Sequence, residues 1–165
     1  QGGYMGIILP AVVVIGILLY LASSYNTFQT TDTRIEAATQ EIGNQLKRQA
    51  DLIPNLEASA KGFLKHEKGI FNELTEARKE VASAVKSGNL QKMADAGKAF
   101  SEVLPKIQIL VESNPEIKGS EVVKNLMDDL RDTSDKVMYA RRLLIDLTAD
   151  YLPLVLSYQT LNHLL

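Results

Sequence analysis

The sequence predicts an all-α protein in which a long apolar N-terminal helix continues into an antiparallel, up-and-down four-helix bundle. Three observations predict this fold. Residues 7–22 are apolar or small without interruption, and four later segments repeat apolar residues at intervals of three, four or seven. No segment alternates apolar and polar residues as a half-buried strand does. Amphipathic helices with short connections favour antiparallel packing in a bundle.

The N-terminal apolar run predicts a helix that lies in a membrane or in the core of an assembly. As a helix, residues 4–22 would be about 28 Å long, close to the roughly 30 Å hydrocarbon thickness of a bilayer. A buried core helix is the alternative, but the run has no polar face for a small bundle to expose. Gly16 would let another helix approach closely. The residues expected to form this surface are Ile7, Leu9, Val12, Ile15, Gly16, Leu18 and Leu19.

The first amphipathic stripe runs from Phe28 to Ile53, with charged residues between its apolar positions. No turn chemistry separates Ala22 from Thr31, so the apolar helix is expected to continue into this first bundle helix. Pro54 cannot donate a backbone hydrogen bond, which predicts a helix end at Asp51 or Leu52, or a kink there.

The residues around Pro54 are interpreted as a helix corner. In this interpretation Asp51 caps the following helix, Pro54 occupies its first turn, and a basic side chain approaches Asp51 at helical spacing. The corner residues are Lys47, Arg48, Asp51, Pro54 and Asn55.

Three further stripes complete the predicted bundle. The second runs from Leu56 to Val85 and ends at Ser87-Gly88-Asn89, where Gly88 suits a left-handed C-cap and Asn89 can cap the next helix. The third, from Leu90 to Val111, contains Pro105, which is expected to interrupt or bend it. ESNPEIKGSE is expected to be a turn, and the fourth stripe runs from Val122 to Tyr151.

The composition argues against several classes of function. The chain has 18 Lys and Arg against 20 Asp and Glu, so it carries no net positive field for nucleic acid. It has no Cys, which removes disulfides, thiolate metal sites and thiol catalysis.

No set of residues with a recognisable ligand or catalytic spacing appears in the sequence. His66 precedes Glu67, but Ile70 stands where a zinc protease needs its second His. Four aspartates cluster between residues 128 and 135 without the loop pattern of a calcium site. We therefore expect no enzymatic activity, no cofactor, no bound metal and no nucleic-acid partner.

The charges are confined to residues 32–150, so the chain has two uncharged ends. The C-terminal end, DYLPLVLSYQTLNHLL, carries more apolar surface than one four-helix core can absorb, which predicts an interface. Its expected residues are Leu152, Leu154, Val155, Leu156, Leu161 and Leu165. The chain is thus divided into an apolar helix (1–24), a helical bundle (25–151) and an apolar tail (152–165).

The segment YNTFQTTDTRIEAATQEIGNQLKRQADLIPNLEASAKGFLKHEKGIFNELTEAR, together with NPEIK and YARR, resembles the LemA family of bacterial membrane-anchored helical proteins. The resemblance runs from about Tyr25 to Tyr151, and QLKRQADLIPNL and KGFLKHE are its most specific blocks. It implies a membrane helix followed by a four-helix bundle and supplies no catalytic residues. The chain departs from the family at Leu144 and Ile145, where relatives tend to have Tyr and Asn.

These patterns lead to an expected function with one alternative. We expect a non-enzymatic structural protein that self-associates, through its apolar helix and tail, into a membrane-attached or filamentous homo-oligomer with at least transient lipid contact. The alternative is a membrane-anchored monomeric adaptor that presents its bundle to partner proteins. If Gln1 is a mature terminus left by removal of a basic leader, the bundle is expected outside the cytoplasm, or at the cell surface in a filament.

Overall fold

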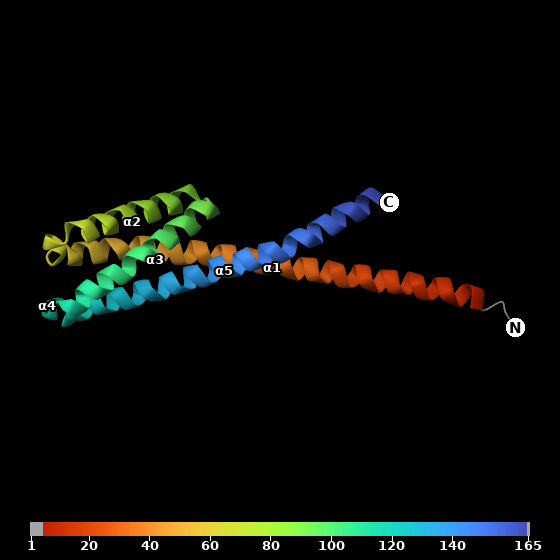
Figure 1. The fold of residues 1–165 in the computed structure, drawn as a ribbon, viewed down its shortest axis with the longest axis horizontal. Coiled ribbons are helices and arrows are strands. Elements are labelled where there is room, and N and C mark those ends of the chain that lie inside the picture. The colour runs from red at the N-terminus through yellow and green to blue at the C-terminus, as the bar shows by residue number, and fades with distance from the viewer. Residues whose placement is uncertain (1–4, 165) are drawn as a thin grey trace. The chain divides into compact units, whose positions relative to one another are not determined.

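The computed structural model describes the backbone of residues 5–164 and the side chains of residues 6–156. Within this range the elements are helix α1 (Met5–Ala60), the 3-10 helix η1 (Leu64–His66) and helices α2 (Lys68–Ser87), α3 (Leu90–Ser113), α4 (Pro115–Lys118) and α5 (Glu121–Leu164) (Figure 1). No strand occurs among these residues. The predicted all-α class and the continuation of the apolar helix into the first bundle helix are confirmed.

The chain divides into two compact units, and helices α1 and α5 contribute to both of them. Unit 1 consists of the chain up to Glu36 and from Ile145 onward, and unit 2 consists of Ala37–Leu144. Unit 2 therefore contains the C-terminal part of α1, all of α2, α3 and α4, and the N-terminal part of α5.

Unit 2 has a hydrophobic core to which α1, α2, α3 and α5 contribute most of the side chains, with Leu64 of η1 and Ile117 of α4 added to them. Its central side chains are completely buried, and they are the apolar positions of the predicted stripes: Leu46 and Ile53 on α1, Leu74 and Val81 on α2, Phe100 and Ile107 on α3, and Leu130 and Val137 on α5. Burial of each such side chain contributes about 1.5–3 kcal/mol to folding. The four stripes thus account for the packing of unit 2.

A glycine brings three of these helices close together. A Cβ atom built on Gly97 of α3 would lie 2.6 Å from Cγ1 of Val137 on α5 and 3.1 Å from Cδ1 of Leu46 on α1. The first distance is shorter than any normal carbon contact, and a β-branched valine has little freedom to move away. The absence of a side chain at this position therefore sets how closely α3 packs on its neighbours.

The predicted corner at Pro54 is wrong, because α1 continues through Pro54 and ends at Ala60. Proline removes one backbone hydrogen bond inside a helix, at a cost of about 3 kcal/mol. The residues on either side, Ile53 and Leu56, are completely buried in the core, as is Ala60. Burial of these three side chains on one helical face offsets the loss. Asp51 lies inside α1 and therefore does not cap the next helix.

The actual break between α1 and α2 lies six residues further along the chain. The Phe63 amide donates to the Ala60 carbonyl (3.1 Å) and the Glu67 amide donates to the Leu64 carbonyl (2.9 Å), which forms the tight turn that contains η1. Leu56 and Ala60, predicted for the second helix, therefore belong to α1.

The predicted caps between α2 and α3 are confirmed. Gly88 ends α2 with a φ of 64° in the left-handed region, where a residue without Cβ is favoured. The Asn89 side chain accepts a 3.0 Å hydrogen bond from the amide of Lys92 at the start of α3. Helix α3 then runs through Pro105 without interruption, and the predicted turn after it contains the short helix α4.

Candidate membrane and assembly surface

The N-terminal part of α1, residues 6–22, exposes apolar side chains all around the helix, and we call it the apolar segment. Helix α1, to which it belongs, is long and apolar enough to cross a membrane by length and composition, and none of the most apolar part of α1 is buried. The exposed fractions of the predicted side chains are high: Ile7 70%, Leu9 74%, Val12 62%, Ile15 56%, Leu18 59% and Leu19 66%. Such a continuous apolar surface is unfavourable in water.

Gly16 lies within the apolar segment with open space around it. A Cβ atom built on Gly16 meets nothing within 4 Å. Unlike Gly97, this glycine is therefore not required by packing within the chain. Its smooth surface is available for the close approach of a second helix.

A polar but uncharged stretch follows the apolar segment along α1. The hydroxyl groups of Thr27 and Thr30 each donate to the backbone carbonyl four residues earlier, at 3.0 Å and 2.9 Å. These hydroxyls are satisfied by the helix itself and do not need water. Tyr20, near the end of the apolar segment, and Tyr25, in the polar stretch, are exposed by 64% and 62%. Tyrosine is enriched where a membrane meets water.

Helices α1 and α5 meet in unit 1 through an aromatic pair. The ring centroids of Phe28 and Tyr151 are 5.0 Å apart, with the rings tilted by 31°, a separation typical of favourable aromatic contacts. Thr31, one turn further along α1, is buried. The C-terminal part of α5 is thereby placed against the polar stretch of α1.

The tail, defined as α5 from Leu152 onward, is partly exposed. Leu152 and Leu156 have exposed fractions of 60% and 55%, whereas Leu154 and Val155 are half-buried. Leu161 lies in α5, but its side chain is outside the described residues, as is all of Leu165. Ile145, exposed by 54%, and the exposed Ala149 precede Leu152 and Leu156 at spacings that place all four on one helical face.

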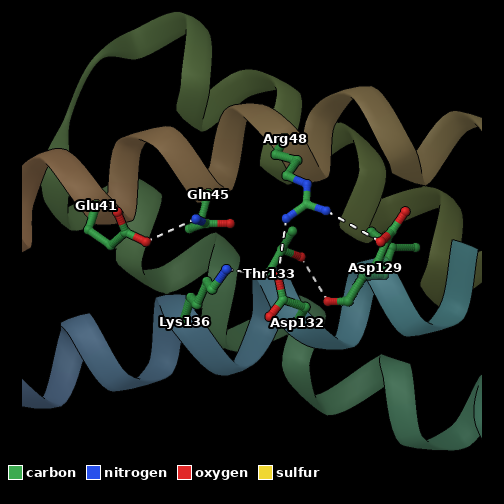
Figure 2. Close-up of polar contacts among 8 residues, drawn as sticks. Glu41, Gln45, Arg48, Asp129, Asp132, Thr133 and Lys136 are labelled. Carbon is green, nitrogen blue, oxygen red and sulfur yellow. Dashed lines mark hydrogen bonds and ion pairs between the residues drawn. The ribbon is translucent and has the colours of Figure 1, made fainter.

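Arg48 forms an ion-pair network across unit 2 and does not approach Asp51 as the predicted corner required. Its Nη1 atom lies 3.1 Å from Asp132 Oδ2 and its Nη2 atom lies 3.3 Å from Asp129 Oδ1, so it joins α1 to α5 (Figure 2). Lys136 Nζ also contacts Asp132 at 3.0 Å. The other corner residues, Lys47, Asp51, Pro54 and Asn55, are exposed along α1.

The aspartate cluster of α5 is paired with cations. The hydrogen bond from Lys136, together with the Arg48 guanidinium, lowers the pKa of Asp132. Arg131 approaches Asp128 at 3.7 Å. No group of three or more His, Cys, Asp or Glu side chains suited to a metal ion occurs in the part of the chain that the structure describes. Because these pairs are exposed, each contributes little to stability.

Gln49 is a buried polar residue that the apolar pattern of the sequence does not reveal. Its side chain is completely buried, and neither its amide nitrogen nor its amide oxygen has a hydrogen-bond partner among the described residues. It lies on the same face of α1 as Leu46 and Ile53, which are core residues. A buried amide without partners destabilises the folded state.

We expect Gln49→Leu to raise the free energy of unfolding of unit 2 by about 1–2 kcal/mol, because leucine fills a similar volume without unpaired polar atoms. Chemical unfolding followed by helical circular dichroism measures the change. Gln91→Leu, at an exposed position of α3, is the matched control and is expected to change stability by less than about 0.5 kcal/mol. A loss of stability in Gln49→Leu would show that the amide has a role that the folded chain requires.

One known protein family matches most of the chain. The sequence pattern of the LemA family matches residues 38–159. This range includes all of unit 2 except Ala37, together with the α5 side of the aromatic pair, and it begins C-terminal to the apolar segment. No curated protein matches the chain. From the length of the family match, together with the predicted helical fold, the chain belongs to the LemA family.

Proposed function

We propose that this chain is a non-enzymatic structural protein that is attached to a membrane by the apolar segment and self-associates through the same segment. The observation that supports the proposal is that every residue from Gly6 to Ala22 is exposed and that this part of the helix has no polar face. A soluble monomer would leave this surface in water, at roughly 25 cal/mol for each Å² of apolar area. Bilayer hydrocarbon covers such a helix on all sides, and a second copy can replace lipid on one of them.

Self-association in a bilayer depends on close packing, because lipid chains are as apolar as the side chains that they surround. Gly16 provides a position where two α1 backbones can approach, and the space around it is open. Unit 2, with its own core, remains outside the hydrocarbon layer in this proposal because it carries most of the charged residues of the chain.

The test is the mass of the protein in a mild detergent, measured by light scattering during size-exclusion chromatography. We expect the parent to be a homo-oligomer and Gly16→Leu to shift toward the monomer, because the added side chain separates the helices. The substitution meets nothing within 4 Å of its Cβ inside the chain, so a lower mass would not reflect misfolding of the monomer.

Gly6→Leu is the matched control, since Gly6 has the same open surroundings at the end of the apolar segment. We expect it to keep the parent mass. A parent that is itself monomeric would contradict self-association and favour the alternative, a membrane-anchored adaptor whose helical bundle meets partner proteins. An unchanged oligomer in Gly16→Leu would exclude Gly16 as the contact.

A further inference from the structure

The two helices of unit 1 lose their charged residues at the same level. Phe28 on α1 contacts Tyr151 on α5, with 5.0 Å between the ring centroids. The first charged residue of the chain is Asp32, one turn after Phe28, and the last is Asp150, directly before Tyr151. The aromatic pair therefore marks the end of the charged part of both helices.

The uncharged parts lie on the same side of this pair. Helix α1 continues into unit 2 after Glu36, and α5 comes from unit 2 before Ile145. Both connections are on the charged side of the pair. The residues before Phe28 and those after Tyr151 therefore lie on the other side of the pair.

We propose that the tail enters the same bilayer as the apolar segment, and that lipid covers its exposed leucines, Leu152 and Leu156. This inference rests on the membrane attachment in the proposed function. It places the boundary of the lipid layer near the Phe28–Tyr151 pair and not at Ala22, where the most apolar part of α1 ends.

The polar stretch of α1 is suited to such a boundary. Residues 5–28 form about 36 Å of helix, which exceeds the hydrocarbon layer but fits within the roughly 40–45 Å that includes the headgroups. Thr27 and Thr30 donate their hydroxyls to the helix backbone, and Tyr25 presents an exposed ring. These groups are tolerated among headgroups without an ionised side chain nearby.

The tail meets the same requirements. Its backbone is helical from Leu152 to Leu164, with Pro153 inside the helix, so its peptide groups bond within the helix except beside Pro153 and in the last turn. Leu152 and Leu156 are exposed by 60% and 55% and lie one turn apart. No Asp, Glu, Lys or Arg occurs from residue 151 to 165. A second copy could also cover these leucines, and the test separates the two occupants.

The absence of Cys from the chain allows a single environment-sensitive dye to be placed by one substitution in the full-length protein. Leu156→Cys and Leu152→Cys report on the tail, Val12→Cys reports on the apolar segment, and Tyr139→Cys, exposed by 68% on α5 in unit 2, is the aqueous control. Each labelled protein is reconstituted into phosphatidylcholine and phosphatidylglycerol vesicles, and its helix content is compared with that of the parent.

Quenching by nitroxide-bearing lipids and by aqueous iodide identifies the surroundings of each dye. We expect lipid nitroxides near the headgroups to quench positions 152 and 156, nitroxides deep in the acyl chains to quench position 12, and iodide alone to quench position 139. A tail dye that neither quencher reaches would indicate contact with another copy and would overturn the inference.

Two other outcomes would also overturn it. If iodide quenches the tail dyes while lipid quenches position 12, the apolar segment is in the membrane and the tail is in water, so the anchoring proposal survives. If lipid quenches neither the tail nor position 12, membrane attachment itself is wrong and the inference fails with it.

Discussion

The double substitution of Val12→Arg and Ile15→Arg is expected to release the protein from the membrane fraction. Both positions lie in the middle of the apolar segment, and their side chains are exposed by 62% and 56%. An ionised side chain near the centre of a membrane helix costs about 2.5–3.5 kcal/mol on insertion scales. Two of them together correspond to a decrease of roughly four to five orders of magnitude in the partition coefficient. The measurement is the share of protein that stays with membranes after an alkaline carbonate wash.

The control for this double variant adds the same charges to α1 outside the apolar segment. Asn44 and Asn55 are exposed on α1 in unit 2, so Asn44→Arg combined with Asn55→Arg is expected to leave the membrane fraction unchanged. Retention of the Val12 and Ile15 variant in the membrane would mean that another part of the chain, or a partner protein, holds it there. Release of both variants would point to a nonspecific effect of charge.

The continuity of α1 could be predicted from the sequence because it depends on local signals. No Gly or Pro separates Ala22 from Thr31, so no residue there breaks the helix through its backbone. The cap at Gly88 and Asn89 is equally local, since a left-handed glycine followed by a side-chain cap needs only neighbouring residues. Signals of this kind can be read without knowledge of the tertiary structure.

The prediction at Pro54 failed because a local signal opposed a tertiary one. The missing amide of proline disfavours a helix by about 3 kcal/mol, and the prediction ranked this local signal above the apolar periodicity. The opposing contribution is the burial of Ile53, Leu56 and Ala60 in the same core. It depends on which face of α1 packs against the other helices, and this is known only from the structure. The apolar stripe continued through the proline, and this periodicity was the signal to follow.

The candidate surface was predictable in part. Residues 6–22 are apolar on every side of the helix, so no single face is marked to pack against a core, and all of these residues are exposed. The contact of Phe28 with Tyr151 was not predictable, because it depends on the register between two helices that are far apart in the sequence. The burial of Gln49 was not predicted, because a polar side chain adds nothing to the apolar pattern even where it shares a helical face with Leu46 and Ile53.

Phe100→Ala is expected to have the largest effect on the stability of unit 2. Phe100 lies on α3 and is completely buried in the core of unit 2. Removal of its ring loses apolar burial and leaves a cavity. Truncation of a buried phenylalanine to alanine typically lowers the free energy of unfolding by about 3–5 kcal/mol. Gly97, one turn earlier, already brings α3 into close contact with Val137 and Leu46, so the helices have little room to close over the cavity. A loss in the upper part of this range is therefore expected.

Chemical unfolding of the full chain in detergent, followed by helical circular dichroism, measures the Phe100 effect. Tyr139→Ala is the control, because this aromatic side chain is exposed by 68% on α5 of the same unit and its removal is expected to change stability by less than about 0.5 kcal/mol. A decrease below about 1 kcal/mol for Phe100→Ala would mean that the core around α3 rearranges to fill the space. The close contact at Gly97 would then be adjustable and would not fix the spacing of the helices.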